Sequence, residues 1–269
     1  AVVWTTTPWT IPVNQGIAYG PEVDYQLFDI TAFAERLLSA RPTSIRGKKL
    51  LIAASLYGDF LKRLEQSFPS VAGEMVQALT DPFKGSQLSG TIARHPMHRL
   101  GGFFARPRPF LPRDHVTTEA GTGLVHMAPD HGEEDFLVCK AAGIDPVFAV
   151  DDAGFYRPDW EWLGGQGSVI NQKFNAPDGP ICSDLREAGA LLSASQDFRH
   201  SYPHSWRSKA RIIYRCTPQW FIPMDKPLEP SPARGRGLGE GETGETAPAS
   251  AQNARTSGPH PGPLPRAGE

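Results

Sequence analysis

The amino-acid composition changes abruptly after Lys226, and this change limits how much of the chain can fold. Residues 227–269 contain eight Pro and eight Gly among 43 residues, and they include no aromatic residue, no Ile and no Val. Such a segment cannot bury enough apolar surface to offset the conformational entropy that is lost on ordering. We therefore predict a folded region over residues 1–226 and a disordered, low-complexity tail over residues 227–269.

Charge, hydropathy and cysteine content narrow the class of protein. The net charge is −2, so no overall basic field suggests DNA binding, and contact with RNA would need a local patch. No apolar run approaches the roughly 18 residues that a membrane helix needs, and no charged leader opens the chain. The three cysteines are odd in number and form no C-x-x-C pair, which argues against a disulfide framework or a local zinc site. We expect a cytoplasmic protein without membrane contact.

Short apolar runs and helical periodicity alternate along the folded region and predict a mixed α/β fold. The opening stretch "AVVWTTT" reads as a strand already under way, so we expect a fragment of a longer protein. The expected strands are 2–7, 24–30, 50–54, 211–215 and 220–222. Helices are expected from Asp59 and over residues 183–191, and a third follows Asp130 as N-cap and ends at Gly143.

The stretch "WTTTPWT" near the start carries four hydroxyl groups, three of them between two indoles and the fourth directly after the second. A strand with one polar face would explain the threonines alone. However, Pro8 has no N–H to donate and interrupts regular pairing. Short, rigid hydroxyl side chains at such a break suit a small polar ligand or an RNA 3′ end.

The stretch "GTGLVHMAPDHGEED", residues 121–135, carries the clearest titratable groups. Gly121 allows close approach of the backbone to a ligand. His126 follows a strand-like segment and is either a core histidine or a pocket residue, and Asp135 either stabilises a helix N-terminus or holds a cationic amine. A metal site of His126, His131 and Asp135 is a competing interpretation, although the spacing differs from H-E-x-x-H.

A third segment, "FRHSYPHSWRSKARIIYR" over residues 198–215, interleaves basic and aromatic side chains. Basic groups can neutralise phosphates, and aromatic rings can stack on unpaired bases. A solvated pair of strands with alternating charges would give the same pattern, so this segment alone does not establish RNA binding.

Taken together, three stretches resemble the motifs of the isoleucyl-tRNA synthetases, also called isoleucine--tRNA ligases, in the same order. They are "WTTTPWTIP", "AGTGLVHMAPDHGEEDF" and "HSYPHSWRSKARIIYRCTPQWF". Related valine and leucine enzymes carry a "TTRP" kind of first motif. The resemblance covers about residues 1–226 and implies the β-barrel-like editing domain that is inserted in a class I aminoacyl-tRNA synthetase.

The resemblance also implies a reaction and a set of site residues. The reaction is hydrolytic proofreading, the deacylation of valyl-tRNA(Ile), so the expected partner is the tRNA(Ile) 3′ end that carries a misattached amino acid. Asp135 captures the α-ammonium group, and His126 rejects isoleucine and orients the attacking water. With Thr6 they form the expected catalytic group. The expected substrate-binding residues are Thr5, Thr7, Trp9, Thr10, Gly121 and Thr122.

The chain departs from the family pattern in two ways. The HIGH and KMSKS signatures are absent, so ATP and Mg²⁺ would belong to a catalytic domain outside this chain, and we expect neither a metal nor another cofactor here. Ser205 stands where the family often has Cys in "YPHCWR". An alternative prediction is therefore an inactive remnant of a truncated synthetase that binds tRNA weakly at most.

Overall fold

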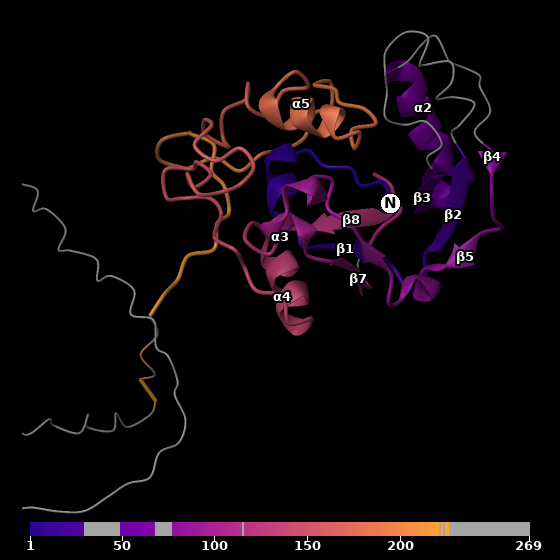
Figure 1. Ribbon diagram of the computed structural model, residues 1–269, viewed down its shortest axis with the longest axis horizontal. Coiled ribbons are helices and arrows are strands. Elements are labelled where there is room, and N and C mark those ends of the chain that lie inside the picture. Colours follow the sequence, from indigo (N-terminus) through magenta and orange to yellow (C-terminus); the bar gives the residue numbers. More distant parts are fainter. Residues whose placement is uncertain (30–48, 68–76, 115, 221, 223, 226–269) are drawn as a thin grey trace, which may run out of the picture. The chain divides into compact units, whose positions relative to one another are not determined.

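The computed structural model describes residues 1–29, 49–67, 77–114, 116–220, 222 and 224–225 (Figure 1). The chain divides into two units, Ala1–Gln219 and Trp220–Glu269. The predicted tail over 227–269 lies outside the described residues. The fold below is therefore that of the first unit.

The first sheet has the strand order β6-β7-β1-β8. These strands are β6 (Ile92–Ala93), β7 (Arg108–Pro112), β1 (Gly16–Tyr19) and β8 (Leu124–Met127). The central strand β1 is buried along its whole length and pairs with β7 in parallel and with β8 antiparallel. In this register Ile17 lies opposite His126, which places that imidazole at an edge strand of the sheet.

The second sheet is built on β2, which pairs with three other strands. The strands are β2 (Asp24–Asp29), β3 (Lys49–Ala53), β4 (Gln77–Ala78) and β5 (Phe83–Lys84). The order is β3-β2-β4, and β5 also pairs with β2. All these pairs are antiparallel. The strand β2 confirms the expectation for 24–30 as far as Asp29, since residue 30 lies outside the described residues, and β3 confirms that for 50–54 to within one residue. β-branched and aromatic residues favour such pleated, buried surfaces.

Four α-helices and four 3₁₀ turns complete the described part. The helices are α2 (Tyr57–Ser67), α3 (Gly102–Ala105), α4 (Glu133–Ala141) and α5 (Pro180–Glu187). The 3₁₀ turns are η1 (Pro8–Val13), η2 (Ala54–Leu56), η4 (Gly85–Leu88) and η5 (His98–Leu100). The mixed α/β expectation is thus confirmed. Among the described residues, no helix is long and apolar enough to cross a membrane.

The expected barrel does not close in the described part of the chain, where the strands form two sheets that no ladder joins. Isolated hydrogen bonds connect them instead, such as Ala53 N–H to the Thr122 carbonyl at 2.8 Å. Residues 121–123 do not extend β8 toward the second sheet, since Gly121 and Gly123 have φ angles of +85° and +74°, which are turn conformations. A Cβ at Gly123 would lie 2.4 Å from the Ala53 Cβ, so this turn also needs glycine for close approach.

Two expected features at the chain start and at α4 are wrong. Residues 2–7 form no strand, because the Thr5 hydroxyl accepts the Thr7 N–H at 3.0 Å and so competes with sheet pairing. The α4 N-cap is Gly132 and not Asp130. The Asp130 carboxylate instead accepts the N–H groups of Val147 and Phe148, which fixes the following loop.

The remaining expectations are met in part. The helix expected from Asp59 begins two residues earlier, at Tyr57, and Gly143 follows the end of α4 with φ +71°. The helix expected over 183–191 is α5, which Pro180 starts three residues earlier. The strand expected over 211–215 is reduced to one bridge between His204 and Arg211. Of residues 220–222, the described residues 220 and 222 lie in no strand.

Tyr25 of β2 links the two sheets through its buried hydroxyl group. The hydroxyl donates to the Gly123 carbonyl at 2.6 Å and accepts the Gly20 N–H at 3.0 Å. Burial raises the pKa of this phenol, so the hydroxyl keeps its proton and can donate. Tyr25 thereby holds the glycine turn that precedes β8.

Replacing Tyr25 with Phe should lower the free energy of unfolding by about 1–3 kcal/mol, because two buried backbone groups lose their partner. Urea unfolding followed by circular dichroism measures this change. Tyr214→Phe, at a ring that is 64% exposed, serves as the control and should change stability by less than about 0.5 kcal/mol. Equal stability of Tyr25→Phe and the wild type would show that the hydroxyl does not link the sheets.

His95 should make the fold sensitive to acid. Met97 N–H donates to its Nδ1 at 3.0 Å, so its Nε2–H donates to the Ile11 carbonyl at 2.9 Å. Burial lowers the pKa of His95 to about 4, and nearby Arg108 acts in the same direction. Because this folded-state pKa lies below that of the unfolded chain, the stabilisation is present above about pH 6.5 and is lost as the pH falls toward 4.

The size of this effect should approach about 3 kcal/mol between pH 7 and pH 4. Urea unfolding across this pH range measures it. His95→Gln keeps an acceptor and a donor but does not titrate, so its stability should depend less steeply on pH. An identical slope in the variant would contradict the assignment to His95.

Candidate functional site

A cavity of about 270 Å³ opens where the threonine-rich loop meets β8 and the start of α4. Its lining residues are Trp4, Thr5, Thr6, Thr7, Thr10, Val125, His126, Ala128, His131 and Asp135. The first and last of these residues, Trp4 and Asp135, are more than a hundred positions apart in the sequence. The cavity is mostly bordered by hydroxyl, imidazole and carboxyl groups, which is typical of a site for a small polar ligand.

The threonine loop is held by its own hydroxyl groups. The Thr5 and Thr7 hydroxyl oxygens lie 3.1 Å apart, and the Thr10 hydroxyl donates to the Thr7 carbonyl at 2.9 Å. Pro8 begins η1, where its missing N–H costs no helical hydrogen bond. The Thr6 hydroxyl makes no hydrogen bond with any other described residue, and this side chain is exposed. Thr6 is therefore available to a ligand.

Trp9 supports the loop from below the cavity. Its side chain is buried in the core cluster that also contains Tyr156 and Phe104. The Tyr156 hydroxyl donates to the Trp9 carbonyl. The Trp9 ring meets the His131 ring edge to face, with centroids 4.6 Å apart. Trp9 thus fixes a cavity residue without lining the cavity itself.

His126 joins β8 to the threonine loop. Its Nε2 lies 3.0 Å from the Thr10 hydroxyl oxygen. Since the single Thr10 proton is donated to the Thr7 carbonyl, we assign the imidazole proton to Nε2, which makes His126 the donor. Its Nδ1 is then an acceptor, and it is buried without a hydrogen-bond partner among the described residues. Burial, aided by His131, lowers the pKa of His126 to about 4, so the ring is neutral near pH 7.

His131 offers a second acceptor nitrogen at the cavity wall. Its Nδ1–H donates to the Tyr214 carbonyl at 2.8 Å, so Nε2 carries no proton. That Nε2 is buried and has no partner in the described part of the chain. Burial also lowers the pKa of His131. Two residues that line one cavity therefore each keep a neutral imidazole with a buried acceptor nitrogen that has no partner among the described residues.

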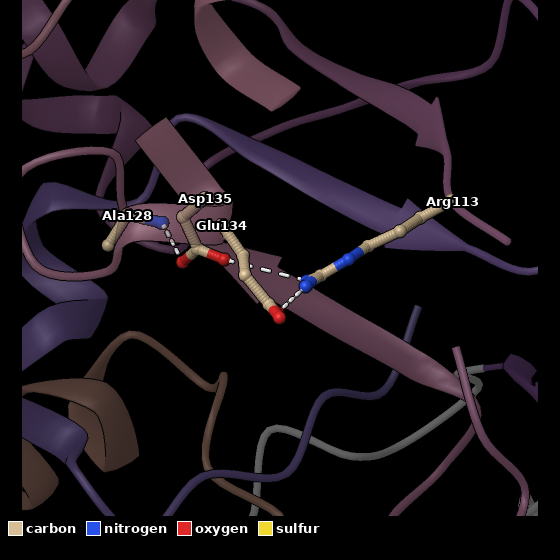
Figure 2. Close-up of polar contacts among 4 residues, drawn as sticks. All are labelled: Arg113, Ala128, Glu134 and Asp135. Atoms are coloured by element: carbon tan, nitrogen blue, oxygen red, sulfur yellow. Dashed lines mark hydrogen bonds and ion pairs between the residues drawn. The ribbon is translucent and has the colours of Figure 1, made fainter. Parts of the chain in front are cut away.

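Asp135 supplies the carboxylate of the cavity from the first turn of α4 (Figure 2). Its Oδ2 accepts the Ala128 N–H at 2.9 Å, and its Oδ1 lies 3.8 Å from Arg113 Nη1. Burial raises the pKa of Asp135, while the Ala128 hydrogen bond and Arg113 act in the opposite direction. The N-terminal end of a helix also favours negative charge. These surroundings of Asp135 suit a carboxylate that binds a cationic group.

The structure brings together six of the nine predicted site residues. Those that line the cavity are Thr5, Thr6, Thr7, Thr10, His126 and Asp135. Trp9 contacts the lining residue His131 but does not itself line the cavity. Gly121 lies beside Trp4 and makes the turn before β8. Thr122 is buried, and its hydroxyl donates to the Val2 carbonyl at 2.6 Å, so this side chain connects backbone segments.

Sequence reasoning did not place four of the lining residues in the pocket. Trp4 borders the threonine run, and its indole could have been included on that ground. Val125 lies in β8 beside His126, and Ala128 follows that strand. His131 entered only as a metal ligand. Among the described residues, no group of three or more His, Cys, Asp or Glu side chains is arranged to hold a metal ion.

An aromatic series begins at the cavity border. Trp4 contacts Phe198 edge to face, with centroids 4.7 Å apart. From there, alternate residues of an extended segment contact one another at centroid distances of 6.0, 6.1 and 6.2 Å; they are Phe198, His200, Tyr202 and His204. The Arg211 guanidinium lies 5.4 Å from the Tyr202 ring centroid, and Arg63 lies 5.0 Å from that of Trp4.

No family model matches the chain, but curated relatives do. The chain is 57% identical over 240 residues to an isoleucine--tRNA ligase of Zymomonas mobilis, covering 89% of this chain and 23% of that protein. It is 41% identical to the isoleucine--tRNA ligase of Gluconobacter oxydans, covering 84% and 22%, and 40% identical to that of Mesorhizobium japonicum, covering 94% and 26%. The chain thus spans about a quarter of the length of these relatives.

A solved structure titled "The crystal structure of GlLeuRS-CP1" is 14% identical, covers 68% of this chain and 65% of its own, and has a TM-score of 0.37. A likeness of this degree carries no argument about fold or function. The sequence relatives carry the conclusion, because they are 40–57% identical over 84–94% of this chain. By sequence, the chain belongs to the isoleucine--tRNA ligase family.

Proposed function

We propose that this chain is the editing part of an isoleucine--tRNA ligase and that it hydrolyses valine from mischarged valyl-tRNA(Ile). The observation that supports this proposal is the single cavity that holds the threonine hydroxyls, His126 and Asp135 together. An aminoacyl ester presents an ammonium group, an ester and a ribose, and each finds a matching group there. The ligase activity of the longer relatives would need ATP, Mg²⁺ and sequence signatures that this chain lacks, so we do not assign it here.

Asp135 binds the α-ammonium group of the substrate. Its carboxylate borders the cavity, and each oxygen retains lone pairs beyond the contacts with Ala128 and Arg113. A charge-assisted hydrogen bond of this kind is among the strongest that a protein forms. The ester carbonyl is then held at a fixed distance from this anchor.

Hydrolysis follows from positioning a water molecule beside the anchored ester. The water oxygen attacks the ester carbon, the bond to the ribose oxygen breaks, and the ribose oxygen takes up the proton that the water loses. The Thr6 hydroxyl, which is exposed and makes no hydrogen bond with another described residue, can donate to the developing oxyanion. No covalent intermediate on the protein is required, because an ester is already activated.

Size accounts for the choice of substrate. An apolar pocket distinguishes valine from isoleucine by one methylene, which is worth roughly 1–3 kcal/mol, a general figure established for this amino-acid pair and not deduced from this chain. A second, hydrolytic site improves on this limit if it excludes the larger group. His126 and Val125 border the cavity on the β8 side and fill the space that a longer side chain would need.

The aromatic series that starts at Trp4 supports the tRNA 3′ end as the partner. Unpaired nucleotides stack on exposed aromatic rings, and nearby arginines neutralise phosphates. The series reaches the cavity border, so a strand lying on it would deliver its terminal ribose to the threonine loop. A tRNA substrate would place the protein in the cytoplasm, with no membrane or DNA involved.

Replacing Asp135 with Asn should slow the release of labelled valine from valyl-tRNA(Ile) by roughly 10- to 100-fold, since a hydrogen bond to a charged group is worth about 1.5–3 kcal/mol. Glu133→Gln, an exposed neighbour on the same helical turn, is the matched control and should retain the wild-type rate. An unchanged rate for Asp135→Asn would refute its role. Wild-type protein that binds tRNA(Ile) but releases no valine would support the inactive remnant instead.

Replacing His126 with Ala should open the cavity and allow hydrolysis of isoleucyl-tRNA(Ile), raising that rate by about tenfold or more relative to the wild type. His126→Phe keeps the bulk while removing the bond to Thr10, and it should still exclude isoleucine. Deacylation of both charged tRNAs measures the two effects. Full rejection of isoleucine by the Ala variant would mean that His126 does not set the size limit.

A further inference from the structure

Arg113 lies next to the predicted ammonium anchor, yet no sequence motif includes it. It follows β7 directly, and its backbone N–H donates to the Tyr19 carbonyl at 2.8 Å, which ties it to the first sheet. The side chain is only 13% exposed. Its two terminal nitrogens serve two carboxylates: Nη2 pairs with Glu134, and Nη1 lies 3.8 Å from Asp135 Oδ1 (Figure 2).

The position of Arg113 relative to the cavity matters more than the contact itself. Neither Arg113 nor Glu134 lines the cavity, whereas Asp135 does. The guanidinium therefore approaches the carboxylate from outside the cavity. Together with the Ala128 N–H on Oδ2, it engages both oxygens and limits rotation of the group.

The charges around Asp135 show why a cation there does not cancel the anchor. Arg113, Glu134 and Asp135 carry +1, −1 and −1, so the three groups together keep one negative charge. Glu134 is 76% exposed on its side chain and balances the arginine at the surface. Two further carboxylates of the described residues lie close by, Glu133 on the same helical turn and Asp130, which acts with Asp135 on the Cys139 thiol. The titratable groups nearby that can be neutral are His126, His131 and Cys139. Burial lowers the pKa of both imidazoles and raises that of the thiol to about 12, so all three are neutral near pH 7.

We propose that Arg113 is a positioning residue for Asp135, holding the carboxylate ionised and turned toward the cavity from outside it. The consequence for catalysis rests on the proposed editing function. Burial alone would favour the protonated acid, which cannot form an ion pair with an ammonium group. Arg113 counteracts this tendency. Glu134 weakens the effect of Arg113, because it shares the guanidinium with Asp135.

The titration of the Asp135 carboxyl tests this inference without any reaction. It can be followed by NMR in the full chain labelled with ¹³C at aspartate carboxyls, with the signal assigned by Asp135→Asn. Arg113→Met removes the cation and should raise the pKa of Asp135. Glu134→Gln releases the guanidinium to Asp135 and should lower it. Arg113→Lys keeps the charge but can serve one carboxylate at a time, so its effect should lie between those of Met and the wild type.

Combining Glu134→Gln with Arg113→Met separates the indirect effect of Glu134 from direct repulsion. If Glu134 acts through Arg113, its replacement should shift the Asp135 titration much less in the Met background than in the wild type. An Asp135 titration that is the same in wild type and Arg113→Met overturns the proposal. Should the Met variant fail to fold, as judged by circular dichroism, the same decision rests on Glu134→Gln and Arg113→Lys.

Deacylation of valyl-tRNA(Ile) then tests the catalytic consequence. A raised pKa leaves more of Asp135 protonated in acid. The rate of Arg113→Met relative to the wild type should therefore be lower at about pH 6 than at about pH 8, by a factor of about three or more. A purely structural defect would lower the rate equally at both pH values and would contradict the inference. Absence of deacylation by the wild type would refute the editing function, while the NMR titration would still decide the role of Arg113.

Discussion

The hydrogen bond between Thr10 and His126 is the contact on which the candidate site depends. It joins the loop before β1 to the edge strand β8, and it lies where solvent is excluded. Because Thr10 also donates to the Thr7 carbonyl, one hydroxyl group sets both the shape of the loop and the tautomer of the imidazole. The bare Nδ1 of His126 is a consequence of this arrangement. Without this contact, the hydroxyls and the imidazole would have no fixed relation to one another.

The surrounding fold explains how polar groups can be held so firmly. β1 lies between β7 and β8, so the threonine loop enters the sheet at its centre, while Trp9 packs into the largest apolar cluster. On the other side, Tyr25 and the glycine turn at 121–123 hold the start of β8. A small number of buried hydrogen bonds therefore connects the cavity to both sheets, and each is strengthened by the low dielectric constant around it.

Much of the site could be predicted from local patterns, and the failures have physical causes. The β-branched and aromatic residues of β2, the short apolar run of β3 and the periodicity of α2 identified those elements, and the structure places Thr6, His126 and Asp135 of the two motifs at one cavity. The expected strand over 2–7 was wrong because the Thr5 hydroxyl satisfies a backbone N–H locally. Asp130 looked like an N-cap, but tertiary contacts with Val147 and Phe148 outweigh the local preference. Arg113 could not be found from sequence, because only the pairing of β7 with β1 brings it to α4.

The walls of the cavity come from stretches of chain that meet only after folding, since Thr5 to Thr10 precede β1 and Asp135 begins α4. An extended chain has no such pocket and cannot recognise an aminoacyl ester. Any molecule that fits will therefore be bound by the native form alone and will draw the folding equilibrium toward it in proportion to its concentration. Occupancy and thermal resistance are in this way two readings of the same free energy.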